Sequence, residues 1–174
     1  MPSSMTLIQT INGTGSSGVF DFTSIPNTYA ELMFLVSCRD TDVAAQGGGF
    51  LIGINGSTAN MLTAYYFNNN NNGAMNAGGS TTTDFDMTVN ANGNAAGTYG
   101  SAIVRIPNYA TTGNAKCMWQ DNMQSVYASG TNTAYHFGKS HYWDQNAAIN
   151  RVTFTSAVNM DAQSRISLYG ISGL

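Results

Sequence analysis

The C-terminal stretch Ser164-Arg165-Ile166-Ser167-Leu168-Tyr169-Gly170-Ile171 alternates polar side chains with apolar or small ones. Successive side chains of an extended chain point to opposite faces, which places Ile166, Leu168 and Gly170 together on one face. The side chains between them point to the other face. This period of two predicts a β-strand with one buried face and one exposed face.

The same period recurs in about ten short segments, and no segment reads as a convincing helix. The other expected strands span residues 6–11, 19–22, 29–38, 50–54, 61–67, 85–89, 99–106, 117–123, 134–144 and 149–155. Asn and Gly clusters separate them, and Asn55-Gly56 predicts a hairpin between the strands on either side. The spacing indicates an all-β fold, an antiparallel β-sandwich that is jelly-roll-like. With no linker or repeat, residues 1–174 are expected to form a single domain.

Two segments depart from the alternation. Leu32 to Val36 is apolar throughout, which is typical of a strand buried on both faces or of one at a subunit interface. A helix is the rival interpretation, but the Gly-rich flanks and aromatic content favour a strand. Asn68 to Asn72 are five consecutive asparagines, and no apolar cluster follows before Thr83. Because Asn tolerates left-handed backbone and bonds its own main chain, this segment is expected to be a long exposed loop.

The charge content excludes some partners. Only 9% of the residues are charged, the formal net charge is −3, and the six Lys and Arg are spread singly. Nucleic-acid binding needs clustered cations, so no nucleic-acid partner is expected. No apolar run approaches the ~20 residues of a membrane span, so no membrane partner is expected either. Residues 1–5 lack a basic segment followed by an apolar stretch, which predicts no secretory signal.

The cysteines and histidines show no metal-site spacing. Cys38 and Cys117 each lie in an expected strand, and whether they pair depends on the fold. Without a secretory signal, two buried free thiols are favoured over a disulfide. His136 and His141 are five residues apart, so they are expected on opposite strand faces, where they share no ligand. No metal site and no cofactor are expected from these residues.

Two pairs of aspartates have a spacing that suits chemistry. Asp84 and Asp86 are expected to point to one face of a strand, as a calcium site or a glycosidase acid pair requires. The favoured interpretation is a solvated strand start, and the calcium alternative stays open. Asp40 and Asp42 have the same spacing and the same interpretation. No nucleophile motif or phosphate loop is present, so no catalytic residue is assigned and a non-enzymatic protein is expected.

Aromatic side chains beside Asn-rich loops suggest a surface for a partner or a glycan. Rings that stack on a sugar face and amides that bond its hydroxyls are the usual chemistry of a carbohydrate site. The alternative is that adjacent aromatics contribute one ring to the core and one to the rim. The candidate contact residues are Tyr65, Tyr66, Asn68, Asn69, Tyr142 and Trp143.

Four short segments carry a resemblance that frames most of the chain. They are Thr6 to Ile11, Phe22 to Tyr29, Ile106 to Tyr109 and Ser167 to Ile171. Together they resemble small virion structural proteins of tailed bacteriophages, especially aquatic ones. The resemblance covers both head decoration (cement) proteins and tail-fibre components and does not separate them. The Asn-rich insert from Asn68 to Gly79 is not part of the shared pattern.

The resemblance implies a function without catalysis. A capsid decoration protein would bind the major capsid protein of the assembled shell and stabilise the virion against internal DNA pressure. Cement proteins of this size commonly act as trimers, so the resemblance implies a homotrimer on the capsid surface. A tail-fibre module that recognises host surface glycans is the alternative. Release by lysis would require no secretory signal.

Overall fold

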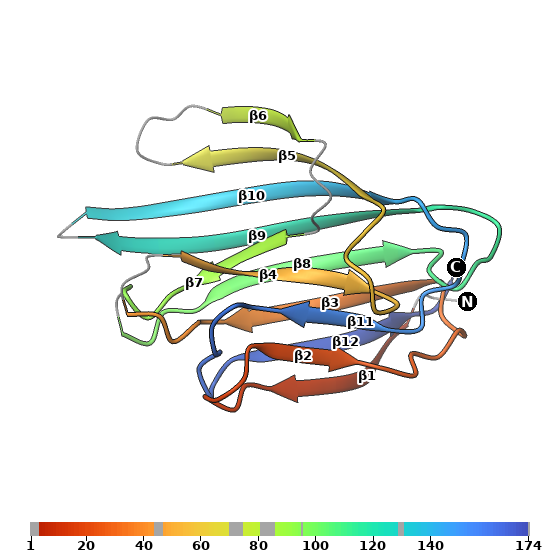
Figure 1. Ribbon diagram of the computed structural model, residues 1–174, viewed down its shortest axis with the longest axis horizontal. Helices are drawn as coiled ribbons and strands as arrows, with labels where there is room; N and C mark the ends of the chain where they lie inside the picture. Colours follow the sequence, from red (N-terminus) through yellow and green to blue (C-terminus); the bar gives the residue numbers. More distant parts are fainter. Residues whose placement is uncertain are drawn as a thin grey trace.

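The computed structural model describes residues 4–43, 47–69, 75–80, 86–94, 96–128 and 131–173. In these ranges twelve strands and no helix are present, and every strand pairing is antiparallel (Figure 1). The strands are β1 (Met5–Asn12), β2 (Val19–Phe22), β3 (Glu31–Cys38), β4 (Gly47–Ile54), β5 (Met61–Asn69), β6 (Met75–Ser80), β7 (Asp86–Asn90), β8 (Gly100–Pro107), β9 (Lys116–Ala128), β10 (Thr131–Trp143), β11 (Val152–Thr155) and β12 (Arg165–Ile171).

The strand order is that of a jelly roll with two inserted hairpins. One sheet runs β1-β12-β3-β8-β9-β10-β5-β6, and the other runs β2-β11-β4-β7. Without β5, β6, β9 and β10, two four-stranded sheets remain, β1-β12-β3-β8 and β2-β11-β4-β7. Successive strands then alternate between the sheets except for β4 and β7, which pair within the second sheet, and this is the order of a jelly roll. The inserted hairpins β5–β6 and β9–β10 extend the first sheet beyond the second (Figure 1). The expected antiparallel β-sandwich is therefore confirmed, and the two insertions, called the wing below, are additions to it.

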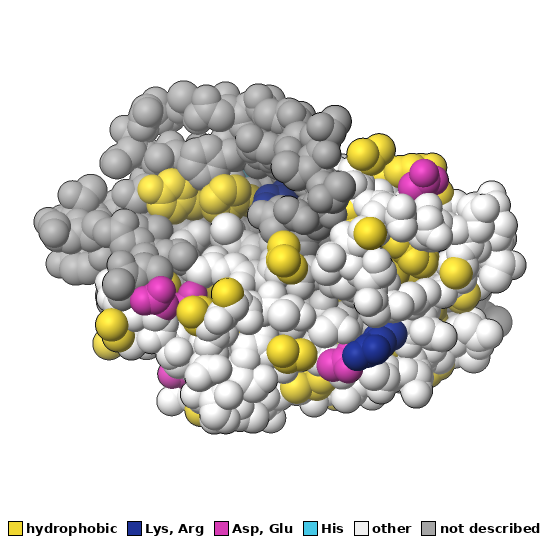
Figure 2. Space-filling view, in the orientation of Figure 1, with side chains coloured by type: hydrophobic (Ala, Val, Ile, Leu, Met, Phe, Trp, Pro, Cys, Tyr) yellow, Lys and Arg dark blue, Asp and Glu magenta, His cyan; other side chains and the backbone are white. Residues whose placement is uncertain are grey.

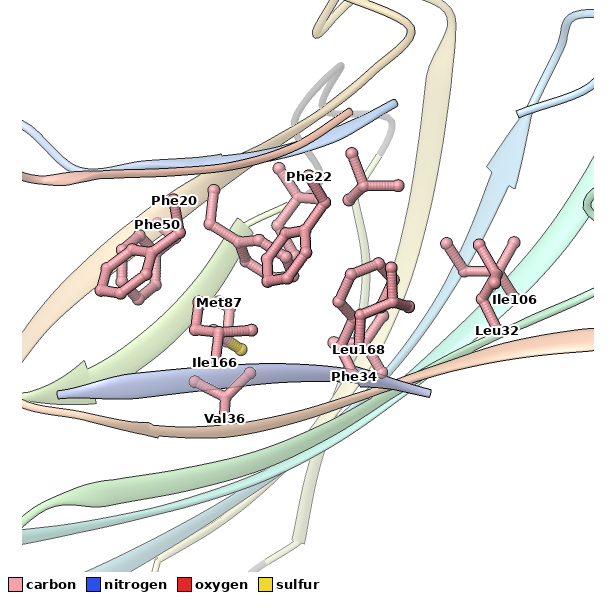
Figure 3. Packing of buried hydrophobic residues seen from close by; sticks show 14 of the residues in the cluster. Phe20, Phe22, Leu32, Phe34, Val36, Phe50, Met87, Ile106, Ile166 and Leu168 are labelled. Carbon is pink, nitrogen blue, oxygen red and sulfur yellow. The ribbon is translucent and has the colours of Figure 1, made fainter. Parts of the chain in front are cut away.

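The core lies between the two sheets. Phe20, Phe22 and Phe50 extend from the four-stranded sheet toward Phe34 and Leu168 of the larger sheet (Figure 3). The rings meet edge to face, which is the arrangement that aromatic quadrupoles favour. Phe154 of β11 has its ring centroid 5.3 Å from that of Phe34, 5.9 Å from Phe50 and 6.2 Å from Phe22. Phe154 thus occupies the centre of an aromatic cluster that joins both sheets.

Strand β3 explains the unbroken apolar run. Leu32, Phe34 and Val36 are buried in the core, whereas Met33 and Leu35 are half-buried on the outer face of the large sheet. The strand is central, with β12 on one side and β8 on the other. A strand with apolar residues on both faces shows no alternation in sequence, although its burial alternates. Strand and not helix is the correct interpretation, and its outer face is apolar.

Two local predictions were wrong. The segment after Asn69, expected to continue as a loop, contains the edge strand β6, which pairs with β5 through backbone bonds that need no apolar side chain. Residues 70–74 and 81–85 lie outside the described ranges. Asn55-Gly56 forms a turn with positive φ at both residues, but β4 and β5 belong to different sheets. The predicted turn is therefore present, but the hairpin is not, because the chain crosses from one sheet to the other after the turn.

The four segments that carry the family resemblance meet in one place. β1 pairs with β12 along its length, and the Tyr109 hydroxyl donates a hydrogen bond to the Pro26 carbonyl. The Tyr29 ring packs on Gly170, and the Ala30 amide donates to the Ile171 carbonyl over 2.8 Å. Tyr109 is fully buried. The residues of these four segments therefore help to hold the jelly-roll framework together, and none of the segments lies in the wing.

Asp161 joins two loops at one end of the sandwich and makes stability depend on pH. The Tyr99 hydroxyl donates to Asp161 Oδ1 over 2.7 Å, and this bond, followed by the one from the Gln163 amide, lowers the pKa of Asp161 from 3.8. Because the pKa of Asp161 is lower in the folded protein than in the unfolded chain, the ionised carboxylate stabilises the fold at every pH above the pKa of the unfolded chain. This contribution is lost as the pH falls through the lower pKa of the folded protein.

We expect Tyr99→Phe to lower the free energy of unfolding by about 1 kcal/mol at neutral pH. The difference from wild type should shrink as the pH falls below 3.8, because a protonated Asp161 accepts a weaker hydrogen bond. Urea unfolding at a series of pH values measures this difference. A difference that stays constant down to the lowest pH would contradict the assignment.

Candidate interaction face

The outer face of the eight-stranded sheet is the surface that faces away from the core. Strand register defines its rows of side chains. One row runs Leu7, Tyr169, Met33, Arg105, Trp119, Ser140 and Ala64 across seven neighbouring strands. In a second row, Tyr142 lies between Cys117 of β9 and Leu62 of β5 and pairs with both. Side chains of one row point the same way, so these rows form a continuous surface from β1 into the wing.

This outer face exposes large apolar side chains. Ten such residues are exposed in the described part of the chain, and seven of them lie here, with 39–58% of their surface accessible. The seven are Met5, Leu7, Leu62, Ile103, Trp119, Met123 and Tyr142. Single exposed apolar side chains are normal on a soluble protein, but seven on one sheet face form a patch that calls for an explanation.

Two pairs of ionisable side chains on this face are joined within the chain, and Arg165 of β12 lies exposed on the same face. Glu31 receives two hydrogen bonds from the Arg105 guanidinium, which raises the pKa of Arg105 and keeps it charged. The same guanidinium lies 5.6 Å from the ring centroid of Trp119, within the range of a cation–π contact. Asp121 and His136 form a second pair on the neighbouring strands β9 and β10. The apolar surface is therefore interrupted by the Glu31–Arg105 ion pair, by the Asp121–His136 contact and by the exposed Arg165.

A shallow groove crosses the wing part of this face. It has a volume of about 560 Å³, and its walls include Leu62, Pro107, Cys117, Trp119 and Tyr142. A hollow of about 340 Å³ adjoins it and shares Ala64, Trp119 and Ser140. The lining is mostly apolar, with one hydroxyl from Ser140 and one from Tyr142. Such a groove suits an apolar side chain or a ring face from a partner.

The opposite side of the molecule has a different surface. Figure 2 shows the side of the four-stranded sheet, where most of the described surface is uncharged and polar, with separate hydrophobic and charged spots. Among its residues, Arg151 donates two hydrogen bonds to Asp21, which lower the pKa of Asp21. Val19 and Leu51 are exposed on this sheet. The larger share of exposed apolar side chains thus lies on the eight-stranded sheet.

The structure separates the candidate contact residues. Tyr142 lies exposed on the outer face, whereas Trp143 is 3% exposed and belongs to the core. The two adjacent rings therefore form no common platform, as the alternative interpretation of that pair expected. Tyr65, Tyr66, Asn68 and Asn69 lie in β5, but their side chains are outside the described part of the structure.

Sequence reasoning did not single out Trp119 and Leu62, which line the groove. The signal was present, because the alternation in 117–123 placed Cys117, Trp119, Asp121 and Met123 on one face. The burial pattern confirms that grouping: these four residues are exposed or half-buried, and those between them are buried. What the sequence lacked was the information that no second sheet of the described residues covers this face.

The two histidines and the aspartate pairs singled out in the sequence lie apart from one another where the structure describes them. His141 is buried, with its Nδ1 2.9 Å from Thr63 Oγ1, and His136 is on the other strand face beside Asp121. Asp40 is buried, which raises its pKa, and Oδ1 accepts a hydrogen bond from the Asp42 amide. Asp84 lies outside the described residues, as does the side chain of Asp86. Across the described ranges, no three His, Cys, Asp or Glu side chains gather as metal ligands would.

The two thiols differ in environment. Both are free; Cys38 is buried in the core, and its pKa is raised to about 12 by desolvation. Cys117 is exposed on the outer face. The expectation of two free thiols is confirmed, but burial holds for Cys38 alone. Because the thiolate is the reactive form, Cys38 should be inert in the folded protein while Cys117 reacts.

Two further observations concern the whole chain. The described residues include no helix that is long and apolar enough to cross a membrane. Comparison of the chain with models of protein families, with curated proteins and with solved structures found no match.

Proposed function

We propose that this chain is a non-enzymatic virion structural protein of a tailed bacteriophage, most simply a capsid decoration protein. In this role it binds the assembled shell through the major capsid protein and stabilises it. The protein acts as a homotrimer on the capsid surface. The proposal joins the resemblance carried by the framework segments to the surface chemistry of the fold.

The observation that carries the proposal is the outer face of the eight-stranded sheet. An enzyme concentrates polar groups in a cleft, whereas an assembly protein needs a broad surface whose apolar area is buried on association. This face is broad and carries few charges, of which Glu31 and Arg105 form an ion pair. Contacts of this kind depend weakly on salt, which suits an assembly that must persist outside the cell.

Jelly-roll topology supports the proposal in a limited way. The architecture occurs in viral capsid domains and also in lectins and cupins, so it allows several functions. In this protein the jelly roll forms the sandwich, and the two inserted hairpins extend one of its sheets. The framework holds the residues that resemble virion proteins, and the wing enlarges the surface available for contact.

Binding to shells tests the proposal. Purified protein is mixed with assembled capsids that lack it and is sedimented, with dissociated capsid subunits as the control. We expect co-sedimentation that saturates at a fixed number of copies per capsid and that changes little when the salt concentration is raised. Equal binding to dissociated subunits, or no binding to capsids, would contradict a decoration role.

A second candidate function has one observation in its favour. Trp119 and Tyr142 are exposed aromatic side chains that line the same groove, and Ser140 adds a hydroxyl there. Aromatic faces with nearby hydroxyls can bind a sugar ring, as a receptor-binding tail module would require. This assignment moves the glycan alternative from the pair Tyr142-Trp143 to the pair Trp119 and Tyr142.

Tryptophan fluorescence distinguishes the two functions. The chain has two tryptophans, of which Trp119 is exposed and Trp143 is buried. A glycan in the groove should shift the emission of Trp119 in a saturable manner, and Trp119→Phe should remove the signal. Host surface glycans that produce no change at millimolar concentration would remove the glycan-binding candidate.

A further inference from the structure

We infer that the outer face of the eight-stranded sheet, centred on the groove of Leu62, Cys117, Trp119 and Tyr142, binds a second copy of this chain. The inference rests on the proposed assembly function and names the partner of the same face. Contact between copies through this face builds the assembly, and other surfaces of that assembly bind the shell. Its test uses the purified protein alone, so its failure is distinguishable from failure of capsid binding.

The exposed apolar area is large enough for a stable contact between copies. From their exposed fractions, the seven large apolar side chains of this face present on the order of 700 Å². A typical monomer has a largest apolar patch of about 300–600 Å², and a standard interface buries about 800 Å² per partner. The half-buried Met33 and Leu35 add to the area on the same face. The summed apolar area of this face is therefore comparable with the area that an interface between two copies uses.

The charge arrangement favours a second copy over a charged partner. When this face packs on a second copy, a charge that meets no opposite charge is buried alone or meets a like charge, and both are costly. Here Glu31 is neutralised by Arg105, and Asp121 is paired with His136. The chain carries a formal charge of −3, but on the strands of this face two acidic residues, Glu31 and Asp121, are balanced by two basic ones, Arg105 and Arg165. A partner chosen by electrostatics would instead require a surface of one sign.

The residue types match those that carry binding energy between protein copies. Trp and Tyr are enriched at the centres of interfaces, together with Met and Arg, and Lys and Glu are depleted there. Trp119 and Tyr142 stand on adjacent strands at the centre of the groove, and Arg105 lies against Trp119. Met123 and Leu62 extend the apolar area along β9 and β5. Cys117 lies inside this region and can report whether it is covered.

The first experiment measures mass and thiol reactivity on the same sample. Light scattering after gel filtration should give a mass of two or three times the 18.4 kDa of one chain at micromolar concentration. Cys117 is exposed in the single chain, so covering this face should slow its reaction with a thiol reagent. If nine in ten chains are assembled and only the free chain reacts, the rate falls about tenfold. Cys38 serves as an internal control, because it should react only after unfolding.

Matched charge substitutions identify the face. We expect Leu62→Lys combined with Met123→Lys to weaken association by about 100-fold or more, because each copy would place unpaired charges in the contact. The same variant should restore the fast reaction of Cys117. Val19→Lys combined with Leu51→Lys makes the same chemical change on the outer face of the other sheet, at similar exposure. This control should leave both mass and thiol rate unchanged, and circular dichroism should show that each variant is folded.

Three outcomes would overturn the inference. The first is a wild-type protein that remains an 18.4 kDa monomer at every concentration tested. The second is an oligomer in which Cys117 reacts as fast as in the dilute chain. The third is an oligomer that the Val19 and Leu51 control disrupts while the Leu62 and Met123 variant does not. Capsid binding by a monomer would retain the proposed function and reject this surface assignment.

Discussion

Phe154→Ala is expected to lower the free energy of unfolding by about 3–5 kcal/mol. Phe154 is fully buried, and its ring contacts three other phenylalanine rings from both sheets edge to face. Removing it loses the transfer free energy of the ring and leaves a cavity that the surrounding β-structure fills poorly. Chemical denaturation with intrinsic fluorescence as the signal measures the loss.

Thr155→Ala is the matched control for this prediction. Thr155 is the next residue of β11, and it is exposed because successive side chains of the strand point to opposite faces. Its replacement should change the free energy of unfolding by no more than about 0.5 kcal/mol. Equal effects of the two substitutions would contradict the placement of β11 with Phe154 toward the core.

Gly170→Ala is expected to lower the free energy of unfolding by about 2–3 kcal/mol. A Cβ at this position would lie 2.6 Å from Cδ1 of Tyr29 and closer still to Cγ and Cδ2. The ring cannot turn away freely, because Tyr29 belongs to the turn that the Tyr109 hydroxyl holds through Pro26. Thermal unfolding of the variant measures the loss.

Gly53→Ala provides the control, because Gly53 is also a strand glycine but has room for a side chain. A Cβ there would lie 3.5 Å from the Ser57 carbonyl oxygen, an ordinary contact. Its replacement should change stability by no more than about 0.5 kcal/mol. If Gly170→Ala were equally harmless, the close packing of Tyr29 on β12 would be wrong.

Much of the fold could be predicted from the sequence because alternation directly reflects burial in a two-layer sandwich. Arg165 to Ile171 alternated in sequence, and β12 has its Ile166 and Leu168 side chains in the core. Strand β6 could not be predicted, since an edge strand pairs through its backbone and needs no apolar pattern. The crossover after Asn55-Gly56 was also hidden, because a turn sequence fixes local backbone but not the sheet that the next strand joins.

The candidate site was less predictable than the fold. Tyr142 and Trp143 are adjacent in sequence, but the strand places one on the surface and the other in the core. The apolar residues of the outer face come from strands far apart in sequence, from Leu7 to Tyr142, and only the strand order brings them together. Exposed apolar side chains also look like core residues in a sequence, so the face became recognisable only when burial was known.

The copy number and position of this protein on intact virions test the central claim most directly. Quantitative gel analysis of purified virions gives the number of copies relative to the major capsid protein, and gold-labelled antibody gives their position. A decoration function predicts hundreds of copies distributed over the head. A few copies confined to the tail, or none on the virion, would contradict it.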